Sequence, residues 1–317
     1  MVIAARAMEN QDEIVYSLIR QVFKEKPGHE FGKTQLTKLL FQLKKELPPD
    51  DPVNQAIPYY WFNYGPMCPA VSAAFEFLCE TGELKKKRRF VFVGQRSYLA
   101  LPMNVITAVK AVVRGFNSWA PLKKYVERIY LAYAPFEFMH PYRYQFLDAT
   151  ESYTKKLRNG QETLNEFAAA KDKHAYGHAL ELKERLYECE LKVPNLADFD
   201  GFEVLFSSFV GDAALALNYL KDHTNYPLLA DVHKTADQIW QTFVKGVRVQ
   251  NIAHDRSYDK DVPQWRKDFA RSTKELEFAL DSFTKVILDQ VTIDEEYPES
   301  ETERDILSAV VDSYFSN

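Results

Sequence analysis

The spacing of apolar residues constrains this chain most. It follows the helical period along nearly all of the 317 residues and changes to the strand period in one short stretch. There Phe90–Val93 and Tyr98–Leu101 flank turn-forming residues and predict a β-hairpin. The pattern predicts a mainly α-helical protein with a small hairpin. No apolar run approaches the ~18 residues of a membrane span, and the N-terminus lacks a signal-peptide pattern, so we expect a cytoplasmic protein with no membrane contact.

Three amphipathic helices precede the predicted hairpin, and two more follow it. Lys26-Pro27-Gly28 interrupts the first apolar stripe, and Pro48-Pro49 ends the second. Three helices followed by a hairpin is the element order of a winged helix-turn-helix, so we assign residues 1–135 to such a module with its connecting helices. The expected helices are residues 14–25, 32–47, 69–82, 103–116 and 121–134.

Two motifs in this module carry a resemblance to a known family. Residues 31–41 (FGKTQLTKLLF) and 59–69 (YYWFNYGPMCP) resemble the "K-T-x-L-x-K-L-L-F … Y-G-P-x-S-P" signature of YwgA-like and Panacea-type antitoxin domains, over about residues 12–135. The resemblance implies a winged-helix fold without enzymatic activity, in a prokaryotic antitoxin, regulator or defence-related protein. Cys68 replaces the serine that usually caps the third helix, which predicts a weaker cap here.

Charge is distributed unevenly along the chain. Residues 1–130 hold 19 Lys and Arg against 12 Asp and Glu, whereas residues 131–317 hold 21 against 33. The excess positive charge of the first part is concentrated beside the hairpin. A wing with this charge can contact nucleic-acid phosphates without reading bases, or dock an acidic protein; a solvated edge that prevents aggregation is the alternative. The residues concerned are Lys85, Lys86, Lys87, Arg88, Arg89 and Arg96.

The third helix does not fit sequence-specific DNA recognition. In a helix-turn-helix this helix enters the major groove, so its outward residues would have to reach base edges. Off the apolar stripe it presents Ser72, Ala73, Glu76 and Glu80, whose two carboxylates phosphates would repel. We therefore expect no base-specific readout through this helix.

The remaining chain predicts an aromatic connector, a helical bundle and a separate C-terminal helix. Aromatic residues crowd residues 136–150, where they pack a joint between domains or, alternatively, stack nucleic-acid bases. Residues 151–290 predict an antiparallel bundle with helices at about 151–190, 201–221, 227–249 and 263–289.

Residues 291–317 combine an acidic spacer with an amphipathic helix. The apolar stripe of this helix packs on the chain's own bundle or docks on a toxin-like protein or a second protomer, so a homodimer is one of the alternatives. We expect no cofactor and no metal site. The docking residues would be Ile306, Leu307, Val310, Val311 and Tyr314.

One constellation in the bundle suggests chemistry. Arg248 and His254 have the R-x5-H spacing of HEPN domains, which these helices weakly resemble, and that resemblance implies a metal-independent ribonuclease. His254 would move a proton, Arg248 would stabilise phosphate charge, and Asn251 would assist. In the structural alternative Arg248 and His254 cap helix ends and pair with nearby aspartates. The favoured hypothesis is a non-catalytic module that binds nucleic acid or protein, with the ribonuclease as its rival.

Overall fold

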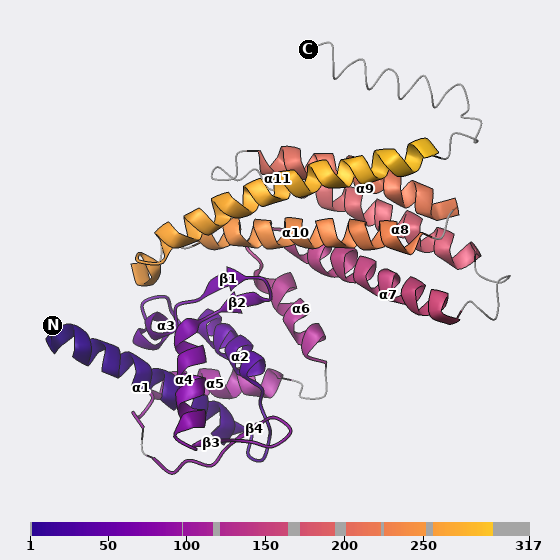
Figure 1. Cartoon of the computed structure of the whole chain (residues 1–317). Coiled ribbons are helices and arrows are strands. Elements are labelled where there is room, and N and C mark those ends of the chain that lie inside the picture. The colour runs from indigo at the N-terminus through magenta and orange to yellow at the C-terminus, as the bar shows by residue number, and fades with distance from the viewer. Residues whose placement is uncertain are drawn as a thin grey trace.

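The computed structural model describes residues 2–96, 98–116, 121–163, 172–193, 201–222, 225–251 and 256–293. Within these ranges the protein is mainly α-helical and contains two short antiparallel hairpins. Figure 1 shows two groups of elements: α1 to α6 with both hairpins form an N-terminal group, and the long helices α7 to α11 lie side by side as a helical group. No helix in the described part of the chain is both long and apolar enough to cross a membrane.

The N-terminal group alternates helices with hairpins. Its apolar stripes face inward and bury Val15, Leu36 and Val71 completely. Cys68 precedes α4 but its side chain makes no capping hydrogen bond, so the prediction of a weakened cap is confirmed. The elements are α1 (Val2–Glu25), α2 (Lys33–Glu46), α3 (Pro52–Ala56), β1 (Tyr60–Phe62), β2 (Gly65–Met67), α4 (Pro69–Glu80), β3 (Leu84–Lys86), β4 (Phe90–Phe92), α5 (Met103–Gly115) and α6 (Leu122–Tyr133).

The hairpin predicted from the strand period forms with a different partner strand. Phe90 pairs with Lys86 and Phe92 with Leu84, whereas Tyr98–Leu101 form no strand in the described structure. Beyond β4 the pairing continues, because the amides of Val93 and Gly94 both donate to the Glu83 carbonyl oxygen. The partner strand lies upstream because charged residues, rather than the residues around Gly94, make the turn.

A second hairpin was not predicted. β1 and β2 pair antiparallel with Tyr60 opposite Met67 and Phe62 opposite Gly65. Gly65 has φ of +87°, a left-handed conformation that glycine adopts without steric cost. The two strands have three residues each, which is too short to show the strand period in the sequence.

The connector contains a π-helix, η1 (Pro141–Leu147), which continues directly into α7 (Asp148–Thr163). The Asp148 amide donates to the Arg143 carbonyl oxygen, five residues back. Phe138, Tyr142 and Phe146 are fully buried and pack against rings of the helical group. The aromatic connector therefore packs the joint, which supports the first of its two predicted roles.

The helical group is built from long helices packed lengthwise. Of the single helix predicted over residues 151–190, the structure describes two parts, α7 up to Thr163 and α8 from Asp172. α8 packs along α9, and α10 packs along α7, α9 and α11. The other elements are α8 (Asp172–Glu190), α9 (Phe202–Asp222), α10 (Tyr226–Asn251), η2 (Arg256–Tyr258) and α11 (Val262–Ile293).

Contacts between the two groups centre on the β1–β2 turn. The indole N–H of Trp240 on α10 donates to the Asn63 carbonyl oxygen over 3.2 Å, and the Tyr258 hydroxyl donates to the Pro58 carbonyl oxygen over 2.8 Å. The Tyr130 hydroxyl of α6 also reaches Asn63, at 3.4 Å. Buried apolar residues of both groups belong to one continuous core, so the turn is held from two sides.

Candidate functional site

The predicted basic residues lie at the tip of the β3–β4 hairpin, which we call the basic hairpin (residues 84–92). Its turn is closed by the Lys87 amide, which donates to the Arg89 carbonyl oxygen over 2.7 Å. All five cations from Lys85 to Arg89 are exposed, and so is Arg96. In the described residues Lys85, Lys86, Lys87 and Arg88 make no ion pair with a carboxylate, so their charge is available to a partner.

The base of the basic hairpin is anchored to the core. Leu84 is buried, and the Phe90 ring meets the Phe75 ring at a centroid distance of 4.7 Å. The backbones of Phe31 and Phe90 exchange two hydrogen bonds of 3.0 and 3.1 Å. Arg89 has a positioning role, because its guanidinium donates to Gln35 and its amide donates to Glu30. The anchored base presents the four remaining cations on a fixed support.

Helix α4 presents the surface expected from its sequence. Ala73, Glu76 and Glu80 are exposed, and Ser72 is half-buried. Glu76 pairs with Lys33 of α2 at 2.7 Å. Its outward face thus offers carboxylates and small side chains rather than groups that read base edges.

Arg248 lies in an aromatic sandwich at the boundary between the two groups. Its guanidinium carbon is 5.2 Å from the Phe62 ring centroid and 4.5 Å from the Trp265 ring centroid. The side chain is buried, and burial lowers the pKa of the guanidinium, although Tyr60 and two nearby aspartates act in the opposite direction. In this position Arg248 joins β1 to α11 through cation–π contacts.

The other residues of the predicted ribonuclease site and the C-terminal docking stripe cannot be placed beside Arg248. His254 lies outside the described residues, and Asn251 is the last residue of α10, with its side chain outside the description. Ile306, Leu307, Val310, Val311 and Tyr314 also lie outside the described residues. In the described part of the chain no group of three His, Cys, Asp or Glu side chains is arranged to hold a metal ion.

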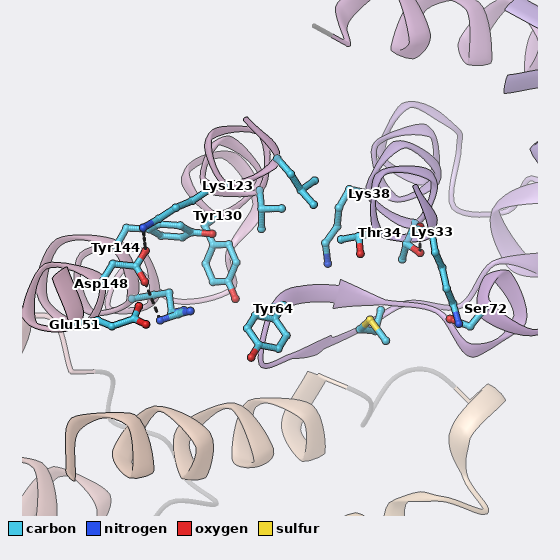
Figure 2. Close-up of a pocket in the computed structure, with 15 residues that line it drawn as sticks. Lys33, Thr34, Lys38, Tyr64, Ser72, Lys123, Tyr130, Tyr144, Asp148 and Glu151 are labelled. Carbon is cyan, nitrogen blue, oxygen red and sulfur yellow. Dashed lines mark hydrogen bonds and ion pairs between the residues drawn. The ribbon is translucent and has the colours of Figure 1, made fainter. Parts of the chain in front are cut away.

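A cavity of about 640 Å³ opens between α2, the β1–β2 turn, α6 and η1; we call it the joint cavity. Figure 2 shows Lys33, Thr34 and Lys38 of α2 on one side, Tyr130, Tyr144 and Asp148 on the other, and Tyr64 between them. This cavity was not predicted from the sequence. Its lining is Lys33, Thr34, Thr37, Lys38, Tyr64, Met67, Ser72, Leu122, Lys123, Val126, Tyr130, Arg143, Tyr144, Asp148 and Glu151.

Lys38 is the most unusual residue of the cavity. Only 1% of its surface is exposed, and its ammonium donates to the Pro66 carbonyl oxygen over 2.7 Å. Among the described residues no carboxylate lies within ion-pair distance of it. Desolvation by burial lowers the pKa of Lys38 to about 7. The side chain therefore changes its charge near neutral pH.

The two sequence motifs meet at this lysine. Lys38 belongs to the first motif and Pro66 to the second, and the Tyr59 hydroxyl donates to the Thr37 carbonyl oxygen over 2.7 Å. Gly65 follows the turn, and a Cβ atom added there would lie 3.1 Å from Tyr130 and 3.4 Å from the Lys38 nitrogen. The two motifs therefore shape one wall of the joint cavity, a spatial relation that their separation in sequence does not indicate.

Comparisons of the chain with protein-family models, with curated proteins and with solved structures find no match. The resemblances to antitoxin domains and to HEPN domains therefore stay predictions.

Proposed function

We propose that this protein is a non-catalytic winged-helix interaction protein that binds the phosphate backbone of nucleic acid through the basic hairpin. The observation that carries the proposal is the run of exposed cations at the hairpin tip, on a base fixed by Leu84 and Phe90. In this proposal α4 stands where a recognition helix would stand, β3 and β4 form the wing, and α7 to α11 form a bundle.

The charge distribution favours phosphate over bases. Lys85 to Arg88 extend beyond the core, where each cation that meets a phosphate releases a condensed counterion. The acidic outward face of α4, with Glu76 and Glu80, would lie unfavourably in a major groove. Binding of this kind is independent of sequence, weakens with salt, and suits an antitoxin, regulator or defence-related protein that needs a second component for its specificity.

The burial of Arg248 supports the non-catalytic reading. A residue that stabilises charge on a phosphate has to reach the substrate, and the Arg248 guanidinium is enclosed by Phe62 and Trp265. The ribonuclease alternative requires His254 and Arg248 to converge on RNA. It predicts RNA cleavage in EDTA that both Arg248→Ala and His254→Ala abolish.

The proposal is tested by fluorescence anisotropy with two labelled duplexes of unrelated sequence. The test variant is Lys86→Glu, Lys87→Glu, Arg88→Glu. The control reverses three exposed lysines of the helical group: Lys260→Glu, Lys267→Glu, Lys274→Glu. The net charge changes equally, so only a local role of the hairpin separates the two variants.

We expect both duplexes to bind the wild type alike, the hairpin variant to lose at least about 100-fold in affinity, and the control to lose far less. Equal losses in the two variants would assign the effect to net charge alone. Strong preference for one duplex, or absence of binding by the wild type at low salt, would contradict the proposal.

A further inference from the structure

The joint cavity has the dimensions of a small-molecule site. Its volume of about 640 Å³ lies within the usual range of ligand pockets, and it is shared between the N-terminal group and the connector, a frequent location of such sites. Leu122 and Val126 of α6 form an apolar wall. Tyr64, whose surface is 68% exposed, presents its ring at the cavity.

Lys38 supplies a cation that no carboxylate in the described part of the chain balances. Its ammonium has three N–H donors, and the described structure uses one of them, toward Pro66. Burying an ammonium without a counter-ion costs free energy, whereas methionine at this position would fill the same space without that cost. A lysine at such a position is explained when an anion completes its surroundings.

The other charges around the cavity do not neutralise Lys38. On α2, Lys33 is paired with Glu76 of α4 at 2.7 Å. On the opposite side, Asp148 is shared by Lys123 at 2.9 Å and Arg143 at 3.0 Å. One carboxylate thus balances two cations, and this end of the cavity is positive as well.

The remaining titratable groups of the cavity do not cancel its excess of positive charge. Glu151 is bound by Lys155 of the same helix, which lowers the pKa of its carboxyl. Tyr130 and Tyr144 are neutral, since burial raises the pKa of both hydroxyls. Tyr64 contributes an exposed phenol ring. The cavity therefore carries a net positive charge centred on Lys38.

We propose that the joint cavity binds a small organic anion, whose carboxylate or phosphate group accepts a hydrogen bond from the Lys38 ammonium and whose apolar part lies against Leu122, Val126 and the Tyr64 ring. This site is separate from the basic hairpin, so it adds a ligand-binding function to the proposed one. Anion binding in the joint cavity does not depend on whether the basic hairpin binds nucleic acid.

The anion and a proton bind together. With a pKa of about 7, Lys38 is partly neutral in the free protein at neutral pH, and a bound anion stabilises its charged form. Affinity is therefore full below pH 7 and falls toward higher pH, by up to tenfold per pH unit. Binding at pH 8 takes up a proton from the buffer.

The test is isothermal titration calorimetry of the full chain with three probes that share a phenyl group. Phenyl phosphate and phenylacetate carry the two anionic groups, and 2-phenylethanol is their neutral counterpart. Lys38→Met removes the charge at nearly constant volume, and Lys110→Met makes the same change on an exposed face of α5. Leu122→Trp fills the cavity from its apolar wall and leaves Lys38 in place.

We expect at least one of the two anions to bind at least about tenfold more tightly than the alcohol. Lys38→Met should remove that advantage, Lys110→Met should retain it, and Leu122→Trp should weaken every probe. The anion that binds better identifies the acidic group. In the wild type, titrations at pH 8 in two buffers of different ionisation enthalpy should reveal proton uptake.

Equal affinity for the anions and the alcohol, anion binding that Lys38→Met leaves unchanged, or no binding of either anion in the millimolar range would each overturn the proposal. If Lys38→Met fails to fold, two other measurements test the proposal: proton uptake by the wild type on anion binding, and the weaker binding of the probes by Leu122→Trp. Neither measurement involves DNA, so failure here is distinguishable from failure of the hairpin.

Discussion

The basic hairpin and the joint cavity both depend on lysine, but they place its charge in opposite environments. On the hairpin, Lys86 and Lys87 are exposed and keep their hydration. In the cavity, Lys38 has only 1% of its surface exposed, so its ammonium has lost its hydration. An exposed cation costs almost nothing to fold and attracts any phosphate, whereas a buried cation costs stability and accepts only an anion that fits beside it. The same residue type thus serves unselective binding in one region and selective binding in the other.

The largest expected effect is on the free energy of unfolding, and it measures the cost of burying the Lys38 ammonium. In the unfolded chain the Lys38 pKa returns to about 10.5, so between pH 7 and 10 the unfolded state binds more protons and the stability of the wild type rises with pH. Lys38→Met should raise the free energy of unfolding by about 3 kcal/mol at pH 6 and lose that pH-dependent rise. Urea denaturation at pH 6 and pH 9 measures both. A variant less stable than the wild type at pH 6 would show that Lys38 is a structural residue.

The next effect separates the two sites by salt. With about four phosphate contacts, affinity of the hairpin for duplex DNA should fall about 100-fold between 50 and 200 mM salt, equivalent to about 2.7 kcal/mol. Affinity of the joint cavity for its anion should change by less than about threefold, because buried charges are weakly screened. Titrations of both partners across the same salt series test this difference. Equal salt slopes would remove the distinction between the sites.

A smaller effect concerns the turn that covers Lys38. Gly65→Ala places a Cβ atom 3.1 Å from Tyr130 on backbone with φ of +87°, so it should lower the free energy of unfolding by about 2 kcal/mol. Gly82 also has a positive φ, at +76°, but nothing lies within 4 Å of its added Cβ. Thermal unfolding of Gly65→Ala and Gly82→Ala should therefore show the larger loss in Gly65→Ala. The reverse order would contradict the close packing of the turn on Tyr130.

The smallest effect is the stability of the charge-reversed hairpin. Because Lys86, Lys87 and Arg88 are exposed, reversing their charge should change the free energy of unfolding by less than about 0.5 kcal/mol. Arg89→Glu should cost more, since Arg89 contacts Gln35 through its side chain. Denaturation curves of the two variants make the comparison. A large loss in the first variant would mean that these cations take part in the fold.

The helices could be predicted from this sequence, whereas the groups that its charged residues contact could not. The apolar stripe of Leu36, Leu39 and Leu40 predicts α2, but at the helical period Lys38 falls outside that stripe, although the structure buries it. Lys38 is buried because the β1–β2 hairpin folds over that side of α2, and two strands of three residues leave no periodic signal.

The hairpin shows the same limit. The positive charge beside the hairpin was visible in the sequence, but the strand pairing was predicted wrongly. The observed turn is Lys87-Arg88-Arg89, an unusual sequence for a turn, whereas Gly94 favoured a turn further along the chain. The joint cavity escaped detection because its walls come from elements far apart in the sequence. The two motifs that meet there were visible, but only the fold shows that Lys38 reaches Pro66.

The π-helix η1 determines which side chains the connector turns toward the joint cavity. Each hydrogen bond of a π-helix spans one residue more than in an α-helix, so the segment holds about one extra residue and rotates what precedes it by about 100° relative to α7. The register of the whole connector thus depends on that residue. If Pro141–Leu147 were shortened by one residue and relaxed to an α-helix, either the rings of Phe138 and Tyr142 would leave the core or Arg143 and Tyr144 would leave the cavity. The extra residue allows one continuous stretch of chain to fill the core with one face and line the cavity with another.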